Sequence, residues 1–188
     1  IYTGERAVLM EKNSDGSLTG CVWDSYNQTS KTYNKWASSY NQGTNLGAAL
    51  MLYSHSGDEQ YKKDADAIMK WTYNNLSNSQ KLVHVCQVVN SDLEGFKGIL
   101  MRYVRRYAAE HNHPEYYTWM AKNAYHAWNN HNSKGVTNSA WLEKSAEDFT
   151  REGKSWQNNG VGPFTTVSAA FNAHLGAVYV HPAYQRTD

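Results

Sequence analysis

Residues 96–107 of the chain read FKGILMRYVRRY, and this stretch is the clearest guide to the fold. Apolar and aromatic side chains recur in it every three or four residues, at Phe96, Ile99, Leu100, Tyr103, Val104 and Tyr107. This spacing places them on one face of an α-helix. We therefore predict an amphipathic helix that follows Asp92 and packs its apolar face against other elements.

Similar periodic segments elsewhere predict a helix-rich fold. Residues 46–53 predict a helix that ends near Gly57, and Asp58 suits the N-cap of the next helix. Further helices are predicted over residues 114–128, more weakly over 141–149, over 165–178, and as last turns over 1–12. Residues 13–40 lack helical periodicity, so we predict a long loop there with one hairpin turning at Asp15-Gly16. The predicted fold class is all-α, built of antiparallel helical hairpins.

Four glycines lie within or at the start of these segments. A glycine costs about 1 kcal/mol relative to alanine in a helix interior. Glycines at such positions indicate the close approach of another helix or of a ligand. The four glycines are Gly43, Gly47, Gly98 and Gly176.

The composition excludes several classes of protein. The 188 residues include 18 basic and 17 acidic side chains, a formal charge of +1, so we predict no nucleic-acid partner. No apolar run approaches the roughly 20 residues of a membrane-spanning helix. Aromatic residues make up 13% of the chain, with 14 Tyr and 7 Trp, whose flat rings suit the apolar faces of sugars. We predict that Cys21 and Cys86 are free thiols.

Two segments carry the candidate chemistry. Residues 36–47 read WASSYNQGTNLG and combine aromatic rings with neutral amides, which donate and accept hydrogen bonds as sugar hydroxyls require. Residues 92–98 read DLEGFKG and bring an acid, an aromatic ring and a base to one helix start. The candidate sugar-binding residues are Trp36, Tyr40, Asn41, Gln42, Asp92, Phe96 and Lys97. The alternative is that Asn41 and Asp92 only cap helices, Phe96 is core and Lys97 is an exposed charge.

Other clusters carry less chemistry. The eight histidines are not at structural-zinc spacing, so we predict no metal site and no cofactor. Arg102, Arg105 and Arg106 are interpreted as a solvated or salt-bridged face.

The two candidate segments resemble a known family. Residues 40–49, YNQGTNLGAA, resemble the YNQGTxxGA segment of glycoside hydrolase family 76, the endo-α-1,6-mannanases, and residues 96–103 resemble its FKGIxxRY segment. The resemblance implies an (α/α)6 toroid that hydrolyses α-1,6-mannan by a retaining mechanism, with α-mannan or manno-oligosaccharide as partner. It also implies that residues 1–188 are the C-terminal half of the domain.

The family's two adjacent catalytic aspartates have no match in this chain. The nearest pair, Glu147-Asp148, is interpreted as solvated surface, because neighbouring helical side chains diverge. We therefore predict no catalytic residue here, an inactive chain on its own, and a missing N-terminal half or a second copy packing on the exposed first and last helices. Polymer degradation implies export. Two alternatives stay open: a non-catalytic carbohydrate-binding or scaffold module, and an α-helical interaction protein without sugar affinity.

Overall fold

The computed structural model describes residues 1–86 and 92–133, together with residues 135, 137, 141–145, 147, 150–151 and 154–155. The helix predicted over residues 165–178 and Gly176 lie outside the described residues. In the segment 141–149, where a weak helical pattern was predicted, the described residues form turns and bends and no helix.

Five α-helices, one short 3-10 helix and three two-stranded antiparallel sheets make up the described part of the chain. The elements in order are α1 (Tyr2–Val8), β1 (Met10–Lys12), β2 (Leu18–Val22), β3 (Ser25–Asn27), β4 (Thr32–Asn34), α2 (Ser39–Ser56), α3 (Glu59–Asn75), η1 (Asp92–Gly95), α4 (Phe96–Glu110), α5 (Glu115–Asn129), β5 (Thr150–Arg151) and β6 (Lys154–Ser155). The helix-rich prediction is confirmed, but the all-α class is wrong in detail. The predicted hairpin at Gly16 joins β1 to β2, and a second hairpin, β3–β4, follows it.

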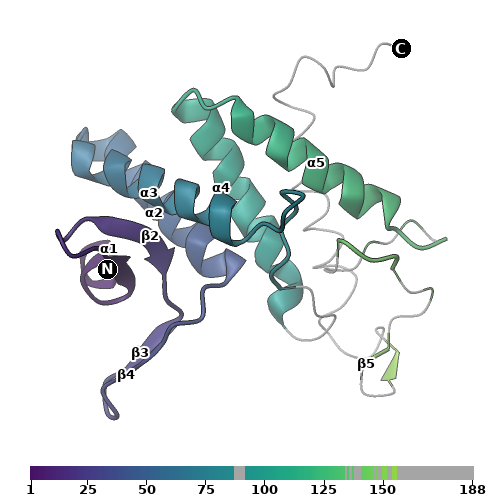
Figure 1. The fold of residues 1–188 in the computed structure, drawn as a ribbon, viewed down its shortest axis with the longest axis horizontal. Coiled ribbons are helices and arrows are strands. Elements are labelled where there is room, and N and C mark those ends of the chain that lie inside the picture. The colour runs from purple at the N-terminus through teal and green to yellow at the C-terminus, as the bar shows by residue number, and fades with distance from the viewer. Residues whose placement is uncertain are drawn as a thin grey trace.

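Helix α2 is the centre of the arrangement (Figure 1). It packs against α3 on one side and α4 on another, while α5 packs on α4 and β2 lies on α3. The two-residue connection after α2 and the four-residue connection after α4 produce the predicted helical hairpins. Gly43 of α2 faces Leu100 of α4, and Gly47 faces Tyr103, so α2 and α4 run parallel. Their N-termini therefore lie at the same end of the molecule.

The close approach predicted from the glycines is present between these two helices. A Cβ built on Gly43 would lie 2.8 Å from Leu100 Cα, and one on Gly47 would lie 2.3 Å from the Tyr103 ring. Leu46 and Leu50 on α2 are fully buried in the core between the helices. The absence of two side chains thus allows α2 and α4 to contact each other almost backbone to backbone.

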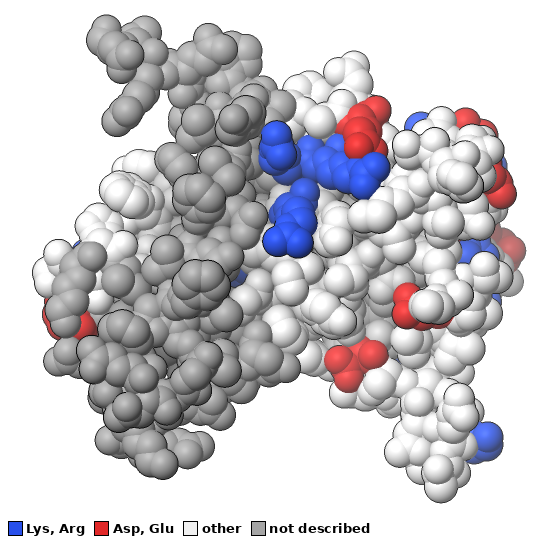
Figure 2. Space-filling view, turned by 180° about the vertical axis from the view of Figure 1, so that it is seen from behind, with Lys and Arg blue, Asp and Glu red and all other residues white. Residues whose placement is uncertain are grey.

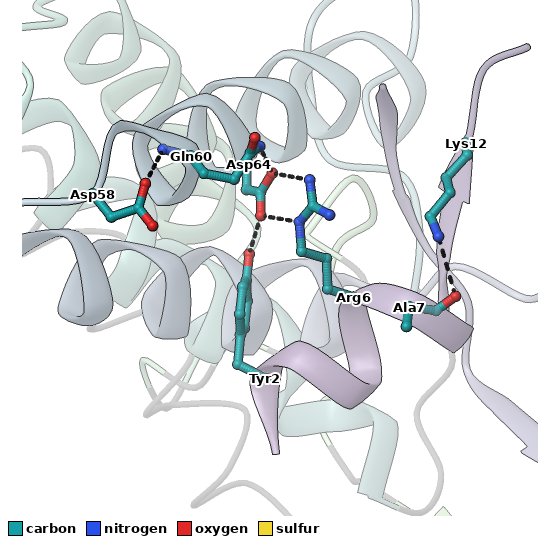
Figure 3. Close-up of polar contacts among 7 residues, drawn as sticks. All are labelled: Tyr2, Arg6, Ala7, Lys12, Asp58, Gln60 and Asp64. Atoms are coloured by element: carbon teal, nitrogen blue, oxygen red, sulfur yellow. Dashed lines mark hydrogen bonds and ion pairs between the residues drawn. The ribbon is translucent and has the colours of Figure 1, made fainter. Parts of the chain in front are cut away.

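A buried carboxylate fastens α1 to α3 (Figure 3). Asp64 accepts hydrogen bonds from Arg6 Nε at 2.6 Å, Tyr2 Oη at 3.1 Å and Gln60 Nε2 at 2.8 Å. Burial beside this carboxylate raises the pKa of Tyr2. In the same view Asp58 accepts a hydrogen bond from Gln60 N, so its predicted role as the N-cap of α3 is confirmed. Helix α1 ends at Val8, and the last residues of the predicted first helix form β1 instead.

On the face drawn in Figure 2, the described residues carry charges of both signs in small groups separated by uncharged areas. Arg106 Nε lies 2.6 Å from Glu110 Oε1 on the exposed side of α4, which confirms the salt-bridged interpretation for this arginine. Cys21 and Cys86 are both free, as predicted, and both are buried. None of the described helices has the length and apolar character required to cross a membrane.

Candidate sugar-binding site

The N-terminus of α2 meets the N-terminus of α4 through two aromatic rings. The centroids of Tyr40 and Phe96 are 5.1 Å apart, and their planes are tilted by 34°. This contact shows that the two candidate segments are adjacent. Tyr40 as a residue remains 41% exposed, so it contacts Phe96 and is still accessible from outside.

Local capping explains why Tyr40 stands at the helix start. Ser38 has extended backbone geometry, and its Oγ accepts a hydrogen bond from Asn41 N at 3.1 Å. This N-cap fixes the first turn of α2 and therefore the direction of Tyr40. Trp36, two residues before the cap, is 42% exposed. Its backbone N–H donates to Asn34 Oδ1, which connects it to the β3–β4 hairpin.

Two asparagines one turn apart on α2 have unsatisfied amide atoms. Asn41 and Asn45 are only 6% and 7% exposed. Asn45 Nδ2 donates to the Asn41 carbonyl at 3.1 Å, but Asn41 Nδ2 and Asn45 Oδ1 have no hydrogen-bond partner among the described residues. A buried polar atom left in this way costs about 1–3 kcal/mol. The site thus presents one orphan donor and one orphan acceptor on neighbouring residues.

Gln42, another candidate, has a structural role. Its side chain is fully buried, and in the orientation that satisfies both amide atoms it donates to the Gly20 carbonyl at 3.0 Å and accepts from Val22 N at 2.8 Å. The amide therefore joins α2 to β2, and its hydrogen-bonding groups are already used by the protein backbone.

Lys97 is fully buried, so the alternative interpretation as an exposed charge is wrong. Its Nζ lies 5.0 Å from the centroid of the Trp141 ring. Burial lowers the pKa of Lys97 to about 7, while the nearby Cys86 acts in the opposite direction. Cys86 in turn accepts a hydrogen bond from Ser39 Oγ at 3.6 Å. A cation–π contact thus anchors residue 141 beneath the starts of α2 and α4.

Asp92 is the first residue of η1, one turn before α4. The N-cap position of α4 is Gly95, three residues after Asp92, and the contacts of the Asp92 side chain lie outside what the structure describes.

Sequence reasoning did not identify Trp141 or Cys86 as parts of this end of the molecule. Each reaches the site through a tertiary contact that leaves no local pattern. Glu147 is exposed and its carboxylate accepts from Ser133, which agrees with its interpretation as surface; Asp148 lies outside the described residues. Within the described part of the chain, no group of His, Cys, Asp and Glu residues could hold a metal ion.

Comparisons with solved structures find the same fold in longer proteins. An inactive variant of the α-1,6-mannanase GH76A of Salegentibacter sp. HEL1_6, with two adjacent aspartates replaced and α-1,6-mannotetrose bound, is 22% identical with a TM-score of 0.74, covering 94% of this chain and 50% of that chain. The Lin0763 protein from Listeria innocua is 20% identical with a TM-score of 0.77, covering 100% of this chain and 49% of that chain. The mannosidase Bt3792 from Bacteroides thetaiotaomicron is 18% identical with a TM-score of 0.63, covering 94% and 46%.

This chain therefore spans about half the length of these relatives. No curated protein matches it. Residues 12–176 match the family model described as glycosyl hydrolase family 76, and this range includes both candidate segments. The chain belongs to glycosyl hydrolase family 76.

Proposed function

We propose that this chain is the sugar-binding half of a glycoside hydrolase that acts on α-1,6-mannan. The observation that carries the proposal is the Tyr40–Phe96 contact, which brings the two family-like segments together at the shared end of α2 and α4. Membership of family 76 and the similarity to a mannanase that binds α-1,6-mannotetrose support it. Because the substrate is an extracellular polymer, we also propose that the protein is exported.

In this proposal, residues 1–188 form the C-terminal half of an (α/α)6 toroid. Helices α2 and α4 are inner helices, and α3 and α5 are outer helices. The parallel packing of α2 on α4 and the antiparallel hairpins support this arrangement. The exposed Met51 on α2 belongs to a face that the other half, or a second copy of the chain, would cover.

The residues of this chain bind and orient the sugar in the proposed mechanism. The accessible faces of Trp36 and Tyr40 stack on sugar rings. Asn41 Nδ2 and Asn45 Oδ1 are buried orphan atoms, so a sugar hydroxyl would pair with both only after the protein atoms that cover them move aside. Asp92 and Lys97 remain proposed members of the same wall, with Lys97 supporting it from beneath through Trp141.

The bond-breaking groups lie elsewhere in the intact protein. A retaining glycosidase places two carboxyl groups about 5–5.5 Å apart across the scissile bond. The 188 residues contain no two consecutive aspartates, whereas the inactive relative was made by replacing such a pair. This difference also favours a second candidate function, a non-catalytic carbohydrate-binding module with the same helices.

Titration calorimetry with α-1,6-mannotetraose, combined with a reducing-sugar assay, tests both candidates. We expect Tyr40→Ala to lower the affinity about tenfold, because it removes a stacking ring, and Tyr40→Phe to retain most of it. Met51→Ala, an exposed position on the same helix, is the matched control and should not change the affinity. Binding without sugar release assigns a binding role to this chain. No binding by the unmodified chain would refute the proposal.

A further inference from the structure

A second group of aromatic side chains lies on the β3–β4 hairpin and two residues before it, separate from the Tyr40–Phe96 pair. Tyr26 and Tyr33 are direct cross-strand partners with ring centroids 4.6 Å apart. Trp23 contacts Tyr33 edge to face at 5.0 Å, and Lys35 Nζ lies 4.4 Å above the Trp23 ring. Tyr33 is 44% exposed. We call Trp23, Tyr26 and Tyr33 the hairpin aromatics.

The hairpin aromatics do not contribute to the buried core. Figure 1 shows the hairpin projecting away from the helices, and none of the three residues belongs to the core cluster or packs against it. Residues 25–34 read SYNQTSKTYN and contain no aliphatic side chain and one charge, Lys31 at the turn. The hairpin is therefore a nearly uncharged surface in which two aromatic rings stand among amides and hydroxyls. This composition suits a neutral ligand with apolar faces and hydroxyl edges, which is the chemistry of a sugar.

Hydrogen bonds at both ends hold the hairpin in one conformation. At the turn, Asn27 Oδ1 accepts from Thr29 N at 2.9 Å and Ser30 N at 3.0 Å. At the base, Asn34 Nδ2 donates to Asp24 Oδ2 at 3.0 Å. A ligand that stacks on a surface ordered in advance loses less conformational entropy on binding. The hairpin aromatics are thus preorganised for ligand binding.

The hairpin leads directly to the proposed sugar site. Trp36 is three positions after Tyr33 in the sequence, which spans at most about 11 Å along an extended chain. Asn34 joins the two segments, because its Oδ1 accepts from Trp36 N at 3.2 Å. Tyr33, Trp36 and Tyr40 are all between 41% and 44% exposed. Three partly exposed aromatic residues thus follow one another along the sequence from the hairpin to the start of α2.

We infer that the hairpin aromatics form a distal subsite for further pyranose units of the mannan chain held at Tyr40 and Phe96, an inference that rests on the proposed function. A purely structural role is the competing explanation. An isolated two-stranded hairpin is only marginally stable in water, and a cross-strand aromatic pair contributes about 0.2–1 kcal/mol to it. The two roles differ in their dependence on the length of the ligand.

The experiment compares α-1,6-mannobiose with α-1,6-mannohexaose by titration calorimetry. We expect the unmodified chain to bind the hexaose more tightly. Tyr33→Val keeps a strand-forming residue but removes the ring, and we expect it to lower hexaose affinity about three- to tenfold while leaving biose affinity unchanged. Tyr33→Phe keeps the ring and is expected to retain the preference for the hexaose.

Each outcome decides between the explanations. A hexaose preference that survives in Tyr33→Val, with biose binding intact, overturns the distal subsite and leaves the proposed function standing. Equal losses in the Val and Phe variants also overturn it, since the ring would not be the binding element. Hexaose binding that depends on Tyr33, without any biose binding, supports the subsite and counts against the Tyr40–Phe96 site. Binding of neither sugar contradicts both.

Discussion

Replacing Gly43 with alanine tests the contact that brings the starts of α2 and α4 together. The new Cβ would lie 2.8 Å from Leu100 Cα and 3.0 Å from Leu100 N. Both are backbone atoms, so no rotation of a side chain can relieve the overlap, and the two helices must separate. Separation would also pull Tyr40 away from Phe96, whose rings are now 5.1 Å apart at centroid.

The expected cost follows from two opposing effects. Overpacking a core contact costs about 1–3 kcal/mol. Alanine recovers about 1 kcal/mol relative to glycine in a helix. Because the obstacle is backbone, we expect a value near the upper limit, a net loss of about 2 kcal/mol in the free energy of unfolding, together with weaker binding of mannotetraose.

Urea unfolding followed by circular dichroism measures this cost. The midpoint should fall while the slope with denaturant stays the same. Gly4→Ala is the matched control, because Gly4 lies in α1 with no heavy atom within 4 Å of the new Cβ. It should leave stability unchanged or raise it by up to about 1 kcal/mol. A Gly43→Ala protein as stable as the unmodified chain would show that α2 and α4 do not pack as described.

Three further predictions concern other contacts. Gly47→Ala would place its Cβ 2.3 Å from the ring of Tyr103, which is a side chain that a second substitution can remove. Adding Tyr103→Ala should therefore partly relieve the overlap. In a double-mutant cycle, the two substitutions together should lower the free energy of unfolding by less than the sum of their separate effects. Asp64→Asn should lower the free energy of unfolding by about 3 kcal/mol, because Arg6 loses its carboxylate partner. Lys62→Ala breaks the exposed ion pair with Asp66 and should lower the free energy of unfolding by less than about 1 kcal/mol. Burial lowers the pKa of Lys97 to about 7 from 10.5, so between these pH values the unfolded chain binds more protons than the folded chain. The free energy of unfolding should therefore rise with pH over that range. If the urea midpoint of the Lys97→Met variant rose by the same amount over this range, Lys97 would not be the cause.

The long helices could be predicted because each one repeats an apolar face over several turns. Residues 96–107 and the segment capped by Asp58 are examples, and both helices form. The β3–β4 hairpin could not be predicted, because strands of three residues are too short to display an alternating pattern. The end of the predicted first helix is the strand β1 instead, in which Met10 pairs with Val22 of β2. Local sequence could not show this, because Val22 lies in a separate segment.

The candidate site was predictable to the extent that its residues act through local sequence. Exposed Trp36 and Tyr40 beside a helix cap have a local signature, whereas the contact of Tyr40 with Phe96 is a tertiary one. Lys97 was open to misinterpretation because a lysine between glycines is usually exposed. Trp141, whose ring lies 5.0 Å from Lys97 Nζ, comes from a segment beyond α5.

The packing of α2 explains why fold and site are linked in this chain. One face of the helix carries Gly43 and Gly47 and sets its distance from α4. Another part of its first turn carries Tyr40, whose ring can touch Phe96 only while that distance is short. A larger residue at either glycine would therefore lower the affinity for the sugar without contacting it. It follows that in the glycine variants the affinity for mannotetraose and the free energy of unfolding should decrease together. In Tyr40→Ala the affinity should decrease while the free energy of unfolding stays nearly the same, because the variant removes an exposed ring and leaves the helix contact intact.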